Sequence, residues 1–191
     1  PQSFLAPGYG KLGLDLLRAG KSADEALRAL LAADPDAPTR QVGIVDAQGR
    51  VACFTGNKDI PAAGCAAGPP SGGGAARLLS VTGRSGSGAP LDLQVFLGNE
   101  FSAQANLMEK NTVWPAMAEA YQTTKGDLTD RLIAALEAAQ REGGDIRGKQ
   151  SAAILIVRGK STGRPWLDKV IDLRVDDSAD PINELRRLVR D

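Results

Sequence analysis

The stretch Gln41–Gly56, QVGIVDAQGRVACFTG, decides the fold of the first half of this chain. It consists of two apolar runs on either side of the sequence DAQG, Asp46–Gly49. Apolar runs rich in β-branched residues, separated by a short turn sequence, are typical of paired antiparallel strands. The stretch therefore predicts a β-hairpin, and the elements before and after it are interpreted around that hairpin.

Two short helices are predicted before the hairpin. The first covers Tyr9–Ala19, with leucines on one face, and is stopped by Gly20. The second begins after Ser22, and Glu25 three residues later completes a capping-box pattern. It must end before the proline at position 35.

After the hairpin, residues 64–90 contain GPPSGGG and GRSGSG and have no steady hydrophobic period. They are predicted to form a Gly-rich loop insertion within a single domain, 1–191. Residues 91–107 return to strand character as two segments, LDLQVFLGN and FSAQANLM.

The second half repeats the pairing of elements. Helices are predicted from about 112 to 123, capped by Asn111, and from the N-cap Asp127 to the glycines at 143 and 144. The run SAAILIVRG, 151–159, is nearly continuous in apolar residues and predicts a strand buried on both faces. The alternating KVIDLRVDD and a final helix starting at Pro181 complete an α+β fold, with antiparallel strands and helices packed outside them.

The composition excludes several kinds of active site. The chain of 191 residues has 23 Lys+Arg, 23 Asp+Glu and no histidine. No Ser-His-Asp triad, Cys-His pair or His-ligated metal can be built from it, and no metal or cofactor is expected. Zero net charge disfavours nucleic acid as a partner. Without an apolar run of membrane length or a signal peptide, a cytoplasmic protein is expected.

The two cysteines, Cys53 and Cys65, carry little information by themselves. Two free thiols in a reducing compartment are expected, and a disulfide across the short span is the alternative. Two thiols without histidine make a poor zinc site.

The strongest polar signal precedes the apolar run, in GDIRGKQS. Polar groups that lead into a buried strand must find partners, so Asp145 and Arg147 either pair to fix the loop or form a site. In a site, Arg147 would hold a carboxylate or orient a polar ligand.

Two further polar groups lie on strands, where alternation puts every second side chain on one face. Gln104 and Asn106, with Ser102 beside them, could polarise or receive a carbonyl, or could form a polar sheet face. Asp172, with Arg174 and Asp176, could belong to a site or to a solvated ion-pair ladder.

Long parts of the chain resemble the uncharacterised family catalogued as domain of unknown function 1028. The resemblance is carried by SFLAPGYGKLGLDLLRAGKSADEALRALLAADPDAPTRQVGIVDAQGRVACFTG, GNEFSAQANLM, MAEAY, the segment ending in AALEAAQREGGDIRGKQSAAILIVR, and IDLRVDDSADPINELRRL. That family is similar to the N-terminal-nucleophile (Ntn) hydrolases, which implies a four-layer α-β-β-α sandwich. The chain departs from the family pattern by its longer Gly-rich loop and by Ala105 where the family has glycine.

The resemblance also implies a function. An Ntn hydrolase attacks an amide with the first Ser, Thr or Cys of its chain and uses the free α-amine as the base, so it needs no histidine. Family members carry a further N-terminal hairpin that would hold this nucleophile. The present sequence starts after it, and Pro1 is no such nucleophile. We therefore expect an amidohydrolase that acts on a small amide. Its substrate site would be lined by Gln104, Asn106, Asp145, Arg147 and Asp172.

In this interpretation the nucleophile lies outside the chain. The alternative is a non-catalytic binding or assembly subunit that keeps the fold. A sheet without its first hairpin would have an open edge, so a homo-oligomer or a companion N-terminal fragment is expected as a partner.

Overall fold

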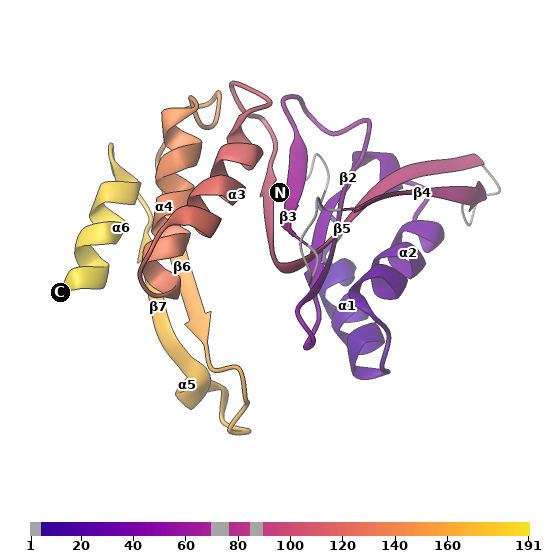
Figure 1. Cartoon of the computed structure of the whole chain (residues 1–191), viewed down its shortest axis with the longest axis horizontal. Helices are drawn as coiled ribbons and strands as arrows, with labels where there is room; N and C mark the ends of the chain where they lie inside the picture. Colours follow the sequence, from indigo (N-terminus) through magenta and orange to yellow (C-terminus); the bar gives the residue numbers. More distant parts are fainter. Residues whose placement is uncertain (1–4, 70–76, 85–89) are drawn as a thin grey trace.

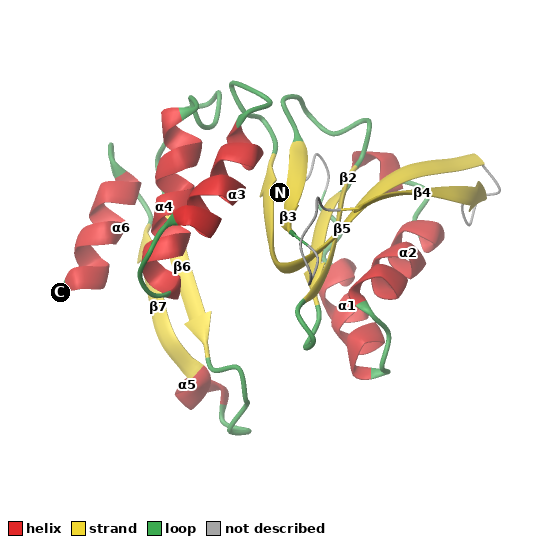
Figure 2. Cartoon of the chain, in the orientation of Figure 1, coloured by secondary structure: helices red, strands yellow, loops and turns green. Residues whose placement is uncertain are grey.

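The computed structural model of this chain describes residues 5–69, 77–84 and 90–191, with no account of the side chains at 77–84 and 90–93. The described part is a mixed α+β structure with two antiparallel sheets (Figures 1 and 2). Helices occur in both the first and the second half of the chain. This agrees with the predicted α+β class. No helix in the described ranges is long and apolar enough to cross a membrane.

The helix pair before the hairpin forms as predicted, as α1 (Gly8–Arg18) and α2 (Ala23–Ala33). The capping box at Ser22 is complete, because its hydroxyl accepts from the Glu25 N–H while the Glu25 carboxylate accepts from the Ser22 N–H. Leu27 and Leu31 of α2 pack against the sheet in one buried cluster, in which Phe54 and Val95 are the largest side chains from the sheet. A short 3₁₀ turn, Ala37–Thr39, leads into the sheet.

The predicted hairpin is confirmed as β1 (Gln41–Val45) and β2 (Arg50–Thr55), paired antiparallel with Val45 opposite Val51. Asp46 in the turn has a buried carboxylate that accepts hydrogen bonds from its own hairpin and from the Ala23 N–H at the start of α2, at 3.2 Å. The turn therefore fixes the helix to the sheet.

A single long strand, β5 (Pro90–Ala105), organises the larger sheet. Its first part pairs with β2 on one edge and with β4 (Arg77–Arg84) on the other, and its last part pairs with β3 (Gly64–Gly68). We predicted two strands over 91–107, broken at Gly98 and Asn99, and this was wrong. The chain changes direction within one strand, where Glu100 has φ of 66°, and does not turn back on itself (Figure 1).

The Gly-rich segment 64–90 was predicted as a loop, and the described part of it corrects this. Both β3 and β4 lie inside it, and both pair with β5. Residues 70–76 and 85–89 of the predicted loop lie outside the described residues. Small residues do not show a hydrophobic period, so the strand character of GCAAG was invisible in the sequence.

The second half contains a second sheet and its helices. The elements are α3 (Val113–Thr123), α4 (Leu128–Arg141), β6 (Ala152–Val157), α5 (Pro165–Asp168), β7 (Lys169–Val175) and α6 (Pro181–Arg190). Asp127 caps α4 as predicted, by accepting from the Asp130 N–H. The N-cap of α3 is Thr112 and not the predicted Asn111, and its side chain makes no cap hydrogen bond.

β6 pairs antiparallel with β7, and one face of this sheet packs on α4 and α6 through Ile133, Ile154 and Leu185. We predicted that β6 is buried on both faces, and in the described structure it is not. Leu155 is 56% exposed and Val157 is 55% exposed. Side chains on this second face of β6 are therefore more than half exposed in the part of the chain that the structure describes.

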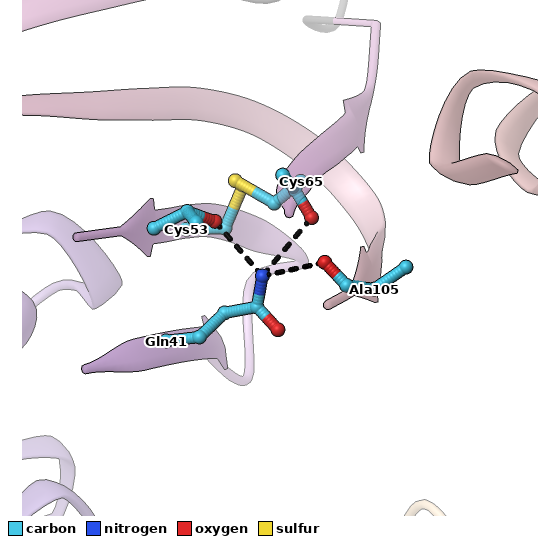
Figure 3. The surroundings of a disulfide bond; sticks show 6 residues. Gln41, Cys53, Cys65 and Ala105 are labelled. Atoms are coloured by element: carbon cyan, nitrogen blue, oxygen red, sulfur yellow. Dashed lines mark hydrogen bonds between the residues drawn. A yellow bond between two sulfur atoms is a disulfide. The ribbon is translucent and has the colours of Figure 1, made fainter. Parts of the chain in front are cut away.

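The expectation of two free thiols is also corrected, because Cys53 of β2 and Cys65 of β3 form a disulfide with their Cα atoms 6.4 Å apart (Figure 3). These strands do not pair with each other. Both pair with β5, and its change of direction brings β3 over β2. The two cysteines meet because of this tertiary arrangement, which their spacing of 12 residues does not reveal.

Candidate functional site

Most of the residues singled out in the sequence meet around one hollow, which we call the site cavity. It has a volume of about 700 Å³ and is bounded by the end of β5, by α3 and α4, by the loop before β6 and by the start of α6. Four of the five predicted site residues line it: Gln104, Asn106, Asp145 and Arg147. A hollow of this size suits a small ligand.

The site cavity exists because the loop after α4 is tied to the end of β5. Met108 and Asp145 form an isolated β-bridge. Beside it, the Ile146 N–H donates to the Leu107 carbonyl at 2.9 Å, and the Glu109 N–H donates to the Gly144 carbonyl at 2.9 Å. Gly144 has φ of 67°, which glycine adopts without cost, so the chain can leave α4 and turn back toward β5 here.

Asp145 and Arg147 form a closed pair at the rim of the site cavity. The Asp145 carboxylate accepts from Nε of Arg147 at 2.9 Å, from Nη2 at 2.5 Å and from the Arg147 backbone N–H at 2.8 Å. These interactions with Arg147 lower the pKa of Asp145, although partial burial opposes the shift. The pairing that was weighed against a site role is therefore present, and both residues line the cavity as well.

Asn106 is buried and is oriented by a residue that the sequence analysis missed, Gln41. The Gln41 amide nitrogen donates to the Ala105 carbonyl at 2.9 Å (Figure 3). It also lies within hydrogen-bond distance of the Gly64 carbonyl, at 3.2 Å, and of the Thr55 hydroxyl, at 3.0 Å. With its nitrogen placed by these acceptors, its oxygen accepts from Nδ2 of Asn106 at 3.4 Å. The chain of amides thus fixes which way Asn106 points.

One signal in the sequence could have found Gln41. It is a polar residue at the first position of an otherwise apolar strand, and such a residue needs a partner when it is buried. What the sequence could not show is that the ends of β2, β3 and β5 all converge on that position.

Gln104 and Ser102 share one face of β5, as alternation predicted, and this face turns toward β1. An ideal Cβ on Gly43 would lie 2.7 Å from Nε2 of Gln104, so a side chain at position 43 would displace the Gln104 amide from its present place. Nε2 of Gln104 and Oγ of Ser102 are buried and have no hydrogen-bond partner in the described structure. Gln104 therefore lines the site cavity while its amide nitrogen lies against β1.

Asp172 is not brought to the site cavity. It lies on β7, where it pairs with Lys169 at 2.5 Å and with Arg174 at 3.2 Å. Lys169, with a smaller effect of Arg174, lowers the pKa of Asp172. The arrangement is the surface ion-pair ladder that was the alternative to a site role.

Within the described ranges, no group of three or more Cys, Asp and Glu side chains is placed to hold a metal ion. The polar groups at the site cavity are amides, one Asp–Arg pair, Lys149 and the Ser151 hydroxyl. These groups can bind carbonyl and carboxylate oxygens, and they can stabilise developing negative charge on oxygen.

The described structure is an α+β protein with a cavity of about 700 Å³ at the junction of two antiparallel sheets. The chain belongs to the DUF1028 family, a family of unknown function, whose model matches residues 1–72 and 74–185. A search of curated proteins finds no match.

Among solved structures, the chain is similar to protein SPO2555 from Silicibacter pomeroyi, also of the DUF1028 family. The two are 23% identical and superpose with a TM-score of 0.63 over 99% of this chain and 68% of that one. At this identity the likeness supports the fold.

Proposed function

We propose that this chain forms most of an amide hydrolase of the Ntn type, which acts on a small amide with a nucleophile from outside these residues. The observation that carries the proposal is the convergence of Asn106, Asp145 and Arg147 on one cavity of about 700 Å³. Water cleaves the acyl C–N bond, so the products are a carboxylic acid and an amine. An α-amine as base needs no histidine, in line with a chain that has none.

A four-layer α-β-β-α sandwich is part of this proposal. It requires more strands than the described sheets contain, and the chain offers a place for them beside β6. A second cavity, of about 430 Å³, lies between β5, α3, α4 and β6, and Phe101, Leu132 and Leu155 line it. A companion fragment with a strand that carries the nucleophile would cover the exposed face of β6 there. A second copy of this chain would cover the same face without supplying a nucleophile.

Asn106 has a defined part in the proposed reaction. As the amide carbon becomes tetrahedral, its oxygen gains negative charge, and side-chain amides oriented in advance stabilise that charge. The Gln41 amide provides this orientation. Arg147, aligned by Asp145, would bind the part of the substrate away from the reacting carbon.

The test starts from protein purified from its natural source. Intact mass and N-terminal sequencing identify the first residue and any companion chain, and amine release is measured over a panel of small N-acyl amides. We expect a free Ser, Thr or Cys terminus together with turnover. We expect Asn106→Ala and Arg147→Ala to abolish the turnover, and Arg174→Ala, on β7 away from the cavity, to retain it. A mature terminus at Pro1 without a companion chain would refute the hydrolase.

A non-catalytic binding or assembly subunit is the second candidate. It is favoured by the apolar surface on β6, β7 and α5, where Leu155, Val157, Val170 and Trp166 are each more than half exposed. A native protein that assembles but releases no amine from any amide would support this candidate. A cytoplasmic location stays a prediction, and the disulfide is more typical of oxidising compartments.

A further inference from the structure

We propose that the site cavity binds a small N-acyl amino acid, with its carboxylate on Arg147 and its apolar groups against α3 and α4. This ligand class specifies the substrate of the proposed amide hydrolysis. Which bond is cleaved rests on that proposed function. The donors and the apolar side chains of the cavity support the binding itself.

The first observation is the set of donors that Arg147 still offers. Asp145 occupies Nε and Nη2 of the guanidinium, and Nη1 makes no hydrogen bond or ion pair with any residue the structure describes. The Arg147 side chain is 69% exposed, so a ligand can reach this edge. Because Asp145 holds the guanidinium plane from one side, an acceptor arriving on the other side meets a donor that is already oriented.

The second observation is a second cation on the same rim. Lys149 lines the site cavity, and its Nζ donates to Asp180 at 3.1 Å while the side chain stays 40% exposed. An ammonium has three donors, so this bond leaves capacity for a ligand oxygen. Each of the two cations already has one carboxylate partner. The preference for a ligand carboxylate therefore comes from donors held in fixed places and not from net charge.

The third observation is the apolar lining below the rim. Val113 and Met117 of α3, Leu136 and Ala139 of α4, and Ile182 of α6 line the cavity. Aliphatic groups of a ligand would be removed from water against these side chains. The cavity therefore combines an apolar interior with a rim of donors, which matches a molecule with a short aliphatic part and a carboxylate.

The amino group of such a ligand is expected to be acylated. A free amino acid would carry an ammonium close to its carboxylate. An ammonium is only a donor, and the groups that the rim leaves for a ligand, Nη1 of Arg147 and Nζ of Lys149, are donors too. An acylated nitrogen has no charge, and its amide oxygen is a further acceptor for the donors of the rim. The acyl amide is then also the bond available for hydrolysis.

Isothermal titration calorimetry with a matched pair of probes tests this inference on the full chain. N-acetyl-L-leucine carries the carboxylate, and N-acetyl-L-leucinamide has the same size without the charge. We expect the acid to bind at least tenfold more tightly than the amide. Arg147→Gln should remove that preference, and Arg147→Lys, which keeps the charge but loses the fork, should reduce it. Arg174→Gln, an arginine on β7 outside the cavity, should keep it.

Circular dichroism of each variant separates loss of binding from loss of fold. Equal binding of the two probes, no binding of either probe, or an unchanged preference in a folded Arg147→Gln would overturn the ligand class. Binding does not need the nucleophile, so the two proposals can fail separately. Tight binding of the acid by this chain, with no acetate released by the native protein purified together with any companion chain, would support the ligand class and count against hydrolysis.

Discussion

Replacement of Asp46 by asparagine tests whether the hairpin turn holds helix α2 to the sheet. The Asp46 carboxylate is only 3% exposed and accepts four hydrogen bonds. Oδ1 accepts from the N–H groups of Gln48 and Arg50, both at 3.0 Å, while Oδ2 accepts from the Ala23 N–H at 3.2 Å and Nε of Arg50 at 2.7 Å. Asp46→Asn keeps one acceptor oxygen and turns an NH₂ group toward two donors.

The expected loss follows from those two donors. The Arg50 side chain is 55% exposed, so water can replace its bond to Asp46 and little stability is lost there. The Ala23 N–H is buried at the start of α2 and loses its acceptor. A hydrogen bond to a charged group contributes about 1.5–3 kcal/mol. We therefore expect Asp46→Asn to lower the free energy of unfolding by about 2–3 kcal/mol at neutral pH.

The pH dependence gives an independent check. Burial alone would raise the pKa of Asp46, but the hydrogen bonds from Arg50, Ala23 and Gln48 outweigh it, and the net pKa is lowered from 3.8. A carboxyl group with a lowered folded pKa stabilises the fold above its unfolded pKa, and this stability is lost as the pH falls through the folded pKa. The difference between wild type and Asp46→Asn should therefore shrink on acidification.

Urea unfolding between about pH 7 and pH 3 measures both effects. Asp176→Asn, at an exposed position after β7, is the matched control and should differ little from wild type at neutral pH. A neutral-pH loss below about 1 kcal/mol, or a difference that stays constant on acidification, would refute the role assigned to the turn.

Two further variants probe the convergence of strands near the site cavity. Gln41→Leu removes the donor to two buried carbonyls and the partner of Asn106, and we expect about 2–4 kcal/mol lower stability in urea unfolding. A change within about 0.5 kcal/mol would contradict the network. In Gly64→Ala, the new Cβ would lie 2.2 Å from the α3 indole, and thermal unfolding should show a loss of about 1–3 kcal/mol. Gly159→Ala has open space around it and should change little, so equal losses in the two glycine variants would count against this contact.

Much of the local structure could be predicted because its causes lie within a few residues of each other. Ser22 and Glu25 cap α2, Asp127 caps α4, and the hairpin around Asp46 has its turn between two apolar runs. The predictions failed at strands whose structure depends on contacts between residues far apart in the sequence. The small residues of β3 show no hydrophobic period, and the apolar run of β6 could not show that one of its faces lacks a cover in the described structure.

The candidate site was predicted in part. Asp145 and Arg147 stood out because charged residues precede an apolar strand, and Asn106 because it alternates with Gln104 in a segment predicted as a strand. In the structure Asn106 directly follows β5 and lines the cavity. Asp172 showed an equally strong pattern and turned out to pair with its neighbours on β7. A strand pattern specifies which side chains share a face, but not what that face meets.

The sequence by itself determined the helices, the hairpin, the α+β class and the absence of histidine chemistry, because capping, alternation and composition are local or additive properties. Only the tertiary structure decided that Cys53 meets Cys65, that Gln41 joins three strand ends, and that Asp172 stays outside the cavity. These outcomes depend on the path of β5. That strand carries β3 over β2, and its end is bridged to the loop at Asp145. Contacts between residues far apart in the chain follow from that path, and no short segment encodes them.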